Sequence, residues 1–247
     1  MTSALHLLEI EIETLWLRDT GGRLERRPHG RAAPHLVIAV SREGWTLALG
    51  SEVPDALAEE LWAMVVAEPP SSDPTVPPTG IARCKQLLGD ALGPVELSKG
   101  PSYVIPRQTA FASAVEIRRS DDENNDLLQD QDIERLNWPA EEWRQLLDGS
   151  LGPWAMAMIG DQVVSICYSA RLTDRGAEAG VSTVPEFQGR GYAAAVTAAW
   201  AALLAPSGRH LFYSIYAANV SSQRVAARLK LRPIGWMWKL TPTLTVG

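Results

Sequence analysis

The sequence is poor in cysteine and lacks the features of exported or membrane proteins. Cys84 and Cys167 are the only cysteines among 247 residues, and their separation matches no metal-ligand spacing. We therefore expect neither a disulfide framework nor a metal site. No uncharged apolar run is long enough to cross a bilayer. The opening MTSALHLLEIEIETLWLRD carries acids and lacks the basic start of a signal peptide, so we expect a cytoplasmic protein that does not contact membranes.

Acidic residues are absent from the last quarter of the chain. The segment from Phe187 to Gly247 holds no Asp or Glu, and its seven basic residues are Arg190, Arg209, Arg224, Arg228, Lys230, Arg232 and Lys239. Its charge of +7, within a total of −6, leaves −13 for residues 1–186. The negative total argues against a nucleic-acid partner, whereas an acid-free basic end favours contact with a small polyanion. Solvated helix faces are the alternative explanation.

The remaining patterns predict two domains of mixed helix and strand, with a boundary near residues 105–106. For residues 1–105 the expected elements are a strand over 5–17, strands over 35–40 and 44–50, a helix over 55–67, a Pro- and Ser-rich loop over 68–80, a helix over 81–92, and a strand over 94–106 broken by Gly-Pro.

Residues 106–247 predict a second alternation of strands and helices. The expected elements are a strand over 113–120, one or two helices over 121–149 with Pro139 opening the second, a hairpin of 154–160 and 162–172 turning at Gly160-Asp161, a strand over 177–184, a helix over 191–205, a strand over 210–217, a helix over 219–230 capped by Asn219, and a strand over 236–240. Gly180, inside a strand, indicates a bulge or a close backbone approach.

The stretch VPEFQGRGYAAAV (184–196) places two glycines and an arginine where an extended segment becomes a helix. Glycine is a poor helix former, so its use here needs a reason. The first turn of a helix offers unpaired amides and the positive end of its dipole, and glycine leaves them accessible to an anion. Arg190 adds a positive charge. This turn therefore predicts a phosphate-binding site.

Three known kinds of phosphate site begin with a glycine-rich turn of this sort. The P-loop pattern is absent. The dinucleotide pattern Gly-x-Gly-x-x-Ala is matched by residues 189–194, but the acid expected about 20 residues downstream is missing. The form Gln-x-x-Gly-x-Ala at 188–193 resembles the pyrophosphate-binding signature of the GNAT superfamily of acyl-CoA-dependent N-acyltransferases. Its lead-in (183–187), a second motif at 218–222 and the order of elements over 110–241 are also similar to that family.

This resemblance implies a GNAT-like, mixed and largely antiparallel sheet flanked by helices, in an α+β chain. Residues 1–105 are not covered by it and are expected to form a smaller α+β domain flanking the acceptor side. The implied activity moves an acetyl group from acetyl-CoA to a primary amine of a small molecule or peptide, by direct attack in a ternary complex. The alternative is an acyl-CoA sensor without turnover, and a dinucleotide enzyme is third. We expect a monomer or homodimer.

The resemblance also assigns residues to the coenzyme. The backbone of Ser182–Val184 would pair with the pantetheine arm, the amides of 188–193 would hold the pyrophosphate, and Arg224 or Arg228 would reach the 3′-phosphate. The implied coenzyme-binding residues are Ser182, Thr183, Val184, Gln188, Gly189, Arg190, Gly191, Tyr192, Ala193, Asn219, Ser222 and Arg224. Asn219 is alternatively only a helix cap, and the two arginines are alternatively solvated.

The catalytic residues are less well defined by the sequence. Glu178 is the candidate base for the amine, unless it faces solvent. The family's general-acid tyrosine is replaced by Ala226, and Lys230-Leu231 stands where Gly-Phe is usual. Tyr216 and Ser222 are the predicted substitutes, with Tyr213 as another candidate. Ser165 and Ser182 are expected to be structural hydrogen-bonding groups.

An acidic run and several tryptophans have two explanations each. The acids Asp121, Asp122, Glu123, Asp126, Asp130, Asp132 and Glu134 would attract a cationic acceptor or form a solvated helix face. Trp138, Trp143 and Trp154 would line a pocket or belong to the core, and Trp200 is expected in the core.

Overall fold

The structure is a computed structural model that describes residues 2–26, 32–123, 125, 128–129, 131 and 138–243. The described residues form two compact units. The first contains the chain up to Ser102, Ile215–Ala218 and the chain from Pro233, and the second contains Tyr103–Ser214 and Asn219–Arg232. The last strand therefore belongs with the N-terminal unit. The domain boundary near residue 105 stays a prediction.

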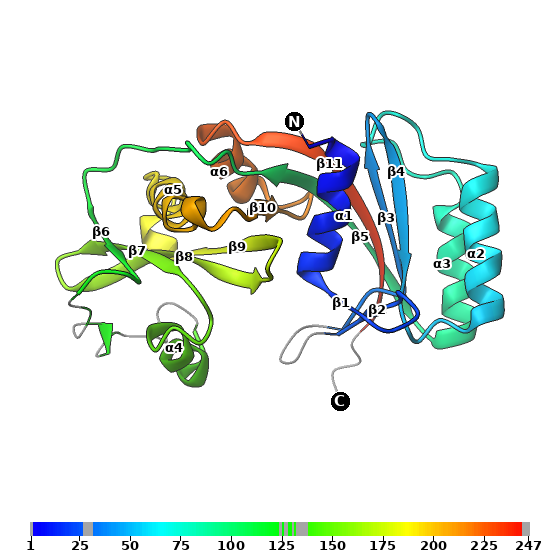
Figure 1. The fold of residues 1–247 in the computed structure, drawn as a ribbon, viewed down its shortest axis with the longest axis horizontal. Coiled ribbons are helices and arrows are strands. Elements are labelled where there is room, and N and C mark those ends of the chain that lie inside the picture. Colours follow the sequence, from blue (N-terminus) through cyan, green and yellow to red (C-terminus); the bar gives the residue numbers. More distant parts are fainter. Residues whose placement is uncertain are drawn as a thin grey trace. The chain divides into compact units, whose positions relative to one another are not determined.

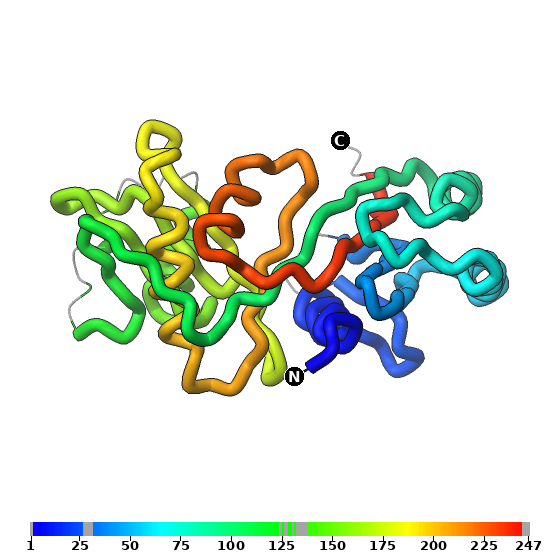
Figure 2. Tube along the Cα trace, turned by 90° about the horizontal axis from the view of Figure 1, so that it is seen from above, coloured from blue at the N-terminus to red at the C-terminus, as the bar shows by residue number. Residues whose placement is uncertain are grey.

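The first unit is a sheet covered on both faces by helices (Figures 1 and 2). Its elements are α1 (Ala4–Leu15), β1 (Leu17–Arg18), β2 (Leu24–Glu25), β3 (Leu36–Ser41), β4 (Gly44–Leu49), α2 (Asp55–Ala67), α3 (Ile81–Leu92), most of β5 (Val95–Val104) and β11 (Arg232–Pro242). The strands follow the order β4-β3-β11-β5, with β3 antiparallel to both neighbours. The predicted strands, helices and Pro-rich loop of residues 35–92 are confirmed.

The core of this unit lies between the sheet and the neighbouring helices α2 and α3. Leu36, Ile38 and Val40 of β3 pack with Leu61 of α2 and Leu88 of α3, and all five are at most 1% exposed. The helix α1 contacts β3 and β4 from the other face (Figure 1). Because both faces are covered, every residue of β3 is buried, as is typical of a central strand.

The prediction of a strand over residues 5–17 is wrong, because most of this segment is α1. The alternation of Ile and Glu in EIEIE suggested a strand. The buried residues instead recur every three or four positions, as on one face of a helix: Leu7, Glu11 and Thr14 form one such series, and Leu8 and Ile12 form a second. The Ser3 hydroxyl accepts a hydrogen bond from the His6 amide at 3.1 Å and caps the helix. Tertiary burial and the cap decide the conformation.

The expected break in the strand over 94–106 does not occur, because β5 runs through Gly100-Pro101 without interruption. The glycine has another purpose. A Cβ at Gly100 would lie 1.7 Å from the carbonyl oxygen of Ile215. Gly100 therefore marks a close approach of backbone to backbone rather than an end of the strand.

The second unit is a sheet in the order β10-β9-β8-β7-β6 with α5 on one face and α4 on the other (Figure 1). Its elements are β6 (Glu116–Arg119), α4 (Ala140–Leu147), β7 (Trp154–Ile159), β8 (Gln162–Leu172), β9 (Gly176–Thr183), η2 (Pro185–Phe187), α5 (Tyr192–Leu204), η3 (Ala205–Ser207), β10 (His210–Ser214) and α6 (Val220–Arg228). Among the described strands of this unit, β9 and β10 pair in parallel and the other pairs are antiparallel. The mixed, largely antiparallel sheet flanked by helices is the predicted fold class.

Most predicted elements of this unit are confirmed, including the β7–β8 hairpin and the helix α4 that Pro139 precedes. Much of the helical region expected before Pro139 lies outside the described residues. Both cysteines are buried and free. None of the described helices is long and apolar enough to cross a bilayer, and the described part of the chain holds no group of three or more His, Cys, Asp or Glu arranged for a metal ion.

The bulge that Gly180 suggested lies in the neighbouring strand. The register of β8 against β9 shifts between Ser169 and Arg171, so Ala170 is the extra residue. Gly180 itself makes room for a side chain, because a Cβ there would be 2.5 Å from the ring of Tyr168. Side chains rather than a second backbone therefore approach Gly180, so the predicted close backbone approach is wrong.

Candidate functional site

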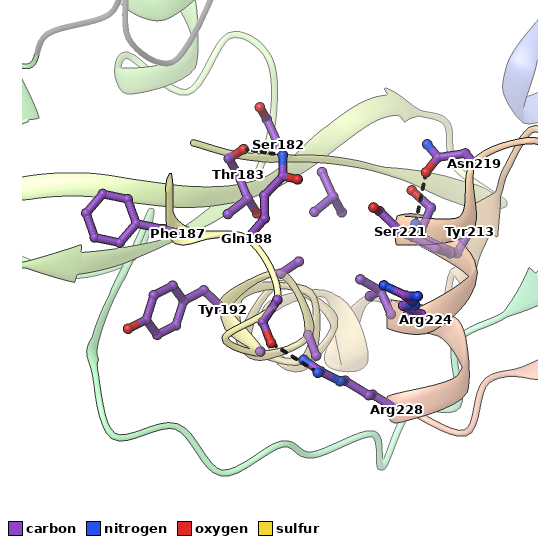
Figure 3. A pocket seen from close by; sticks show the side chains of 17 residues that line it. Ser182, Thr183, Phe187, Gln188, Tyr192, Tyr213, Asn219, Ser221, Arg224 and Arg228 are labelled. Atoms are coloured by element: carbon purple, nitrogen blue, oxygen red, sulfur yellow. Dashed lines mark hydrogen bonds between the residues drawn. The ribbon is translucent and has the colours of Figure 1, made fainter. Parts of the chain in front are cut away.

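The site lies where the parallel strands β9 and β10 separate. Three residue pairs join them, ending at Phe212↔Glu178, and β9 then continues to Thr183. Beyond this point a cavity of about 610 Å³ opens between β9, the start of α5, and α6 (Figure 3). Ten of the twelve predicted coenzyme-binding residues line it: Ser182, Thr183, Gln188, Gly189, Gly191, Tyr192, Ala193, Asn219, Ser222 and Arg224. Val184 and Arg190 are outside the lining.

The glycine turn forms one end of the cavity. Gly189 and Gly191 have φ values of +79° and +94°, a left-handed conformation that glycine adopts without a steric penalty. Gly191 is the N-cap of α5, and no side chain caps this helix. Its first-turn amides therefore lack the usual side-chain acceptor and face an accessible space. This is the arrangement that binds anions at helix N-termini.

The positive charge at the cavity comes from α6 rather than from Arg190. The guanidinium of Arg228 donates to the carbonyl of Gly189 at 3.1 Å, and Arg224 lines the cavity one turn earlier (Figure 3). Arg190 instead donates to the carbonyl of Glu186 at 3.1 Å and lies 5.1 Å from the ring centroid of Phe187. We predicted that the Arg190 side chain adds positive charge at the phosphate site, but this side chain does not line the cavity.

The N-terminus of α6 brings Asn219 and Ser222 to the opposite wall. The Asn219 side-chain oxygen Oδ1 accepts a hydrogen bond from the Ser222 amide at 3.0 Å, so the residue is the expected helix cap. Its side chain also lines the cavity. The cap and the coenzyme-binding explanations are therefore compatible.

A tyrosine faces the cavity, but it is Tyr213 rather than Tyr216. Tyr213 is 3% exposed and lines the cavity, as Ser222 does. Tyr216 is half exposed, belongs to the first unit and places its ring 5.1 Å from the Lys239 ammonium. Ala226 is buried at 2% exposure. No sequence pattern distinguished the two tyrosines. Because β10 ends at Ser214, Tyr213 lies within the strand and Tyr216 lies beyond it.

Glu178 is buried, which makes the solvent-facing alternative wrong. It is 5% exposed, and its Oε1 accepts hydrogen bonds from the Ser214 amide at 2.8 Å and the Ser214 hydroxyl at 2.6 Å. It is not among the residues lining the cavity. Ser165 is structural, as expected: its hydroxyl donates to the Ser182 carbonyl at 3.1 Å and lies 2.7 Å from the Thr183 hydroxyl.

The described residues of the acidic run and the predicted tryptophans do not line the cavity. Asp121 forms an ion pair with Arg119, and Asp122 accepts from the Arg119 amide at 2.7 Å. Asp126, Asp130, Asp132 and Glu134 lie outside the described residues. Trp143, Trp154 and Trp200 are at most 3% exposed and belong to the core, and Trp138 packs against Trp143 and Tyr168.

The buried Tyr213 predicts a pH-dependent stability. Burial raises the pKa of Tyr213 from its ordinary value of 10 to about 12. Between these pH values the unfolded chain loses this proton while the folded chain keeps it, so folding stability falls as pH rises. The parent should lose about 2 kcal/mol more than Tyr213→Phe between pH 10 and 12, measured by urea unfolding. Equal losses in both proteins would contradict the burial of this hydroxyl.

The structure thus defines a class of protein: an α+β domain in which two separating parallel strands and a glycine-capped helix border a cavity with accessible first-turn amides. Residues 109–232, half of the chain, match the family model described as GNAT acetyltransferase. The chain belongs to this family.

Two solved structures show the same fold over the whole chain. One is an acetyltransferase of the GNAT family from Colwellia psychrerythraea, with 14% identity, a TM-score of 0.50, and 98% of each chain covered. The other is a GCN5-related N-acetyltransferase from Kribbella flavida, with 14% identity, a TM-score of 0.50, and 100% of this chain and 98% of that chain covered. At this identity the likeness concerns the fold alone. No protein of curated function matches the sequence.

Proposed function

We propose that the protein is an N-acyltransferase that moves an acetyl group from acetyl-CoA to a primary amine by direct attack in a ternary complex. The observation that carries this proposal is the uncapped, glycine-lined start of α5 at one end of the cavity, with Arg224 and Arg228 beside it. A diphosphate fits this donor set, because bare amides and guanidinium groups are the usual partners of phosphate oxygens.

The other walls suit the rest of the coenzyme. The backbone from Val181 to Thr183 lines the cavity beyond the last β9–β10 pair, so its edge is available to an extended arm, as in strand addition. Arg224 is the candidate for the 3′-phosphate. When bound, the coenzyme supplies an acetyl thioester, which is an activated acyl group with a good leaving group.

Proton transfers accompany the attack. An alkyl amine with a pKa near 10.4 must lose a proton, at a cost of about 4–5 kcal/mol at neutral pH. We expect this proton to leave through solvent in the open cavity, since Glu178 is outside the lining. The hydroxyls of Tyr213 and Ser222, which both line the cavity, are the candidates to donate to the departing sulfur. Because a thiol has a pKa near 8.5, this donation assists the reaction without being essential.

Thiol release tests the activity. The parent protein is incubated with acetyl-CoA and a panel of polyamines, aminoglycosides and lysine peptides, and free thiol is followed. Release with at least one amine supports the transferase. Tight coenzyme binding without release for any amine would favour the second candidate, an acyl-CoA sensor, which the absence of a hydroxyl at Ala226 motivates. Stronger thermal stabilisation by NAD than by coenzyme A would favour a dinucleotide enzyme.

Arg228→Ala is expected to weaken coenzyme A binding about 10-fold, because it removes one charge-assisted contact at the phosphate site. The difference should shrink as salt is raised, since the residue is exposed. Calorimetry at two ionic strengths measures both effects. Arg232→Ala is the matched control, because Arg232 is exposed and outside the lining. An equal loss of affinity in the control would show a general effect of charge rather than a specific contact.

A further inference from the structure

The β9–β10 ladder ends where a backbone amide of β10 donates to a side chain instead of to a β9 carbonyl. In a continued parallel ladder, the amides on the β9 side of β10 would donate to β9 carbonyls. The Ser214 amide donates instead to the Glu178 carboxylate at 2.8 Å. The next amide, of Ile215, donates to the carbonyl of Pro101 at 3.2 Å. Since successive amides of a strand point to opposite edges, the Ser214 amide points toward β9 and would otherwise be available for pairing there.

The Glu178 side chain is held firmly for this contact. The same oxygen that accepts from the Ser214 amide also accepts from the Ser214 hydroxyl at 2.6 Å, which gives two bonds to a single residue. Glu178 is 5% exposed. The strand β8, which pairs with β9, has an extra residue next to Glu178. This residue is Ala170, between the pairs Ser169↔Ala179 and Arg171↔Glu178. A bulge increases local strand twist, which favours separation of β9 from β10 at this point.

We propose that Glu178 is a positioning residue that ends the β9–β10 pairing and holds the mouth of the coenzyme cavity open. The Glu178 carboxylate accepts the hydrogen bond of the Ser214 amide, so this amide does not pair with a β9 carbonyl and the β9–β10 ladder does not continue. The edge of β9 from Val181 to Thr183 then remains a wall of the cavity instead of being covered by β10. The part of this inference that concerns the coenzyme rests on the proposed function; the part that concerns the strands does not.

This role differs from that of a general base in a measurable way. A base needs an ionisable carboxylate in contact with the amine, whereas a strand-ending contact needs only an oxygen acceptor of the right length. Glu178→Gln keeps such an acceptor and removes the ionisation. Glu178→Met keeps the volume and removes the acceptor. The two variants therefore separate the roles without opening a cavity in the sheet.

The test measures four quantities in the full-length protein: the hydrogen-exchange rate of the Ser214 amide, the calorimetric Kd of coenzyme A, the KM for acetyl-CoA, and the kcat of acetyl transfer. For Glu178→Met we expect Ser214 exchange to become at least about 10-fold faster and Kd and KM to rise about 10-fold, with kcat within about threefold. For Glu178→Gln we expect all four quantities within about threefold of the parent values. The exposed Glu60→Ala is the matched control.

Each outcome decides the inference. A Glu178→Gln variant with normal Kd but kcat lowered about 100-fold or more would assign Glu178 to proton transfer and overturn the positioning role. Unchanged exchange and Kd in Glu178→Met would also overturn it. Should Glu178→Met not fold, Ser214→Ala, which removes only the hydroxyl donor, must show faster exchange of the backbone amide at position 214 than the parent. If the parent binds no coenzyme A, the proposed function fails, and the exchange measurements alone decide the strand contact.

Discussion

Replacing Gly191 with glutamate is expected to lower the affinity for coenzyme A by about 100-fold or more. Gly191 has a φ of +94°, and a Cβ there would lie 3.4 Å from the ring of Phe111 and 3.5 Å from Arg228. The new side chain would occupy the accessible space over the first turn of α5, and its carboxylate would repel a diphosphate. Calorimetry of the variant and the parent measures the loss.

A second variant controls for the backbone strain that Gly191→Glu introduces. Gly149 has a φ of +86°, is exposed, and would place a Cβ in open space away from the cavity lining. Gly149→Glu therefore adds the same charge and a similar backbone cost, about 1–2 kcal/mol for the left-handed conformation, without touching the site. It should bind coenzyme A like the parent. Equal affinities in Gly191→Glu and the parent would remove the basis for the phosphate site.

Trp200→Ala is expected to destabilise the protein by about 3–5 kcal/mol. Trp200 is fully buried on α5, the helix that begins at the glycine turn, and its indole nitrogen donates to the Ser169 hydroxyl at 3.1 Å. The truncation leaves a large cavity and removes a buried hydrogen bond. Because typical domains are stable by only about 5–15 kcal/mol, the loss is a large fraction of the total.

Urea unfolding of Trp200→Ala measures this loss, with Trp62→Ala as the matched control. Trp62 is half exposed on α2, so its truncation should change the free energy of unfolding by less than about 1 kcal/mol. A loss of equal size in both variants would contradict the central place of Trp200 in the core.

The features predicted correctly from the sequence are those with local causes. The glycine turn, the cap at Asn219 and the Gly160-Asp161 hairpin depend on conformational preferences of a few adjacent residues. The helix α5 follows from its run of alanines. For this reason the elements around the proposed phosphate site and their order along the chain could be predicted, and most of the predicted coenzyme-binding residues do line one cavity.

The features that could not be predicted from the sequence depend on contacts between segments far apart along the chain. The helix α1 is decided by burial of Leu7 and Leu8, which the local alternation in EIEIE does not show. The continuity of β5 depends on the backbone of Ile215, which approaches Gly100. The burial of Glu178 depends on Ser214, which is 36 residues away. Spacing along one strand does not reveal the partner that another strand supplies.

The most direct test of the phosphate site is an amide chemical-shift titration of the ¹⁵N-labelled protein with coenzyme A, and with pantetheine as the ligand that lacks the diphosphate. If the first turn of α5 binds the diphosphate, the amides of Gly189, Gly191, Tyr192 and Ala193 will shift most with coenzyme A and remain unchanged with pantetheine. If these amides stay unchanged while coenzyme A saturates the protein elsewhere, the site is not where we place it.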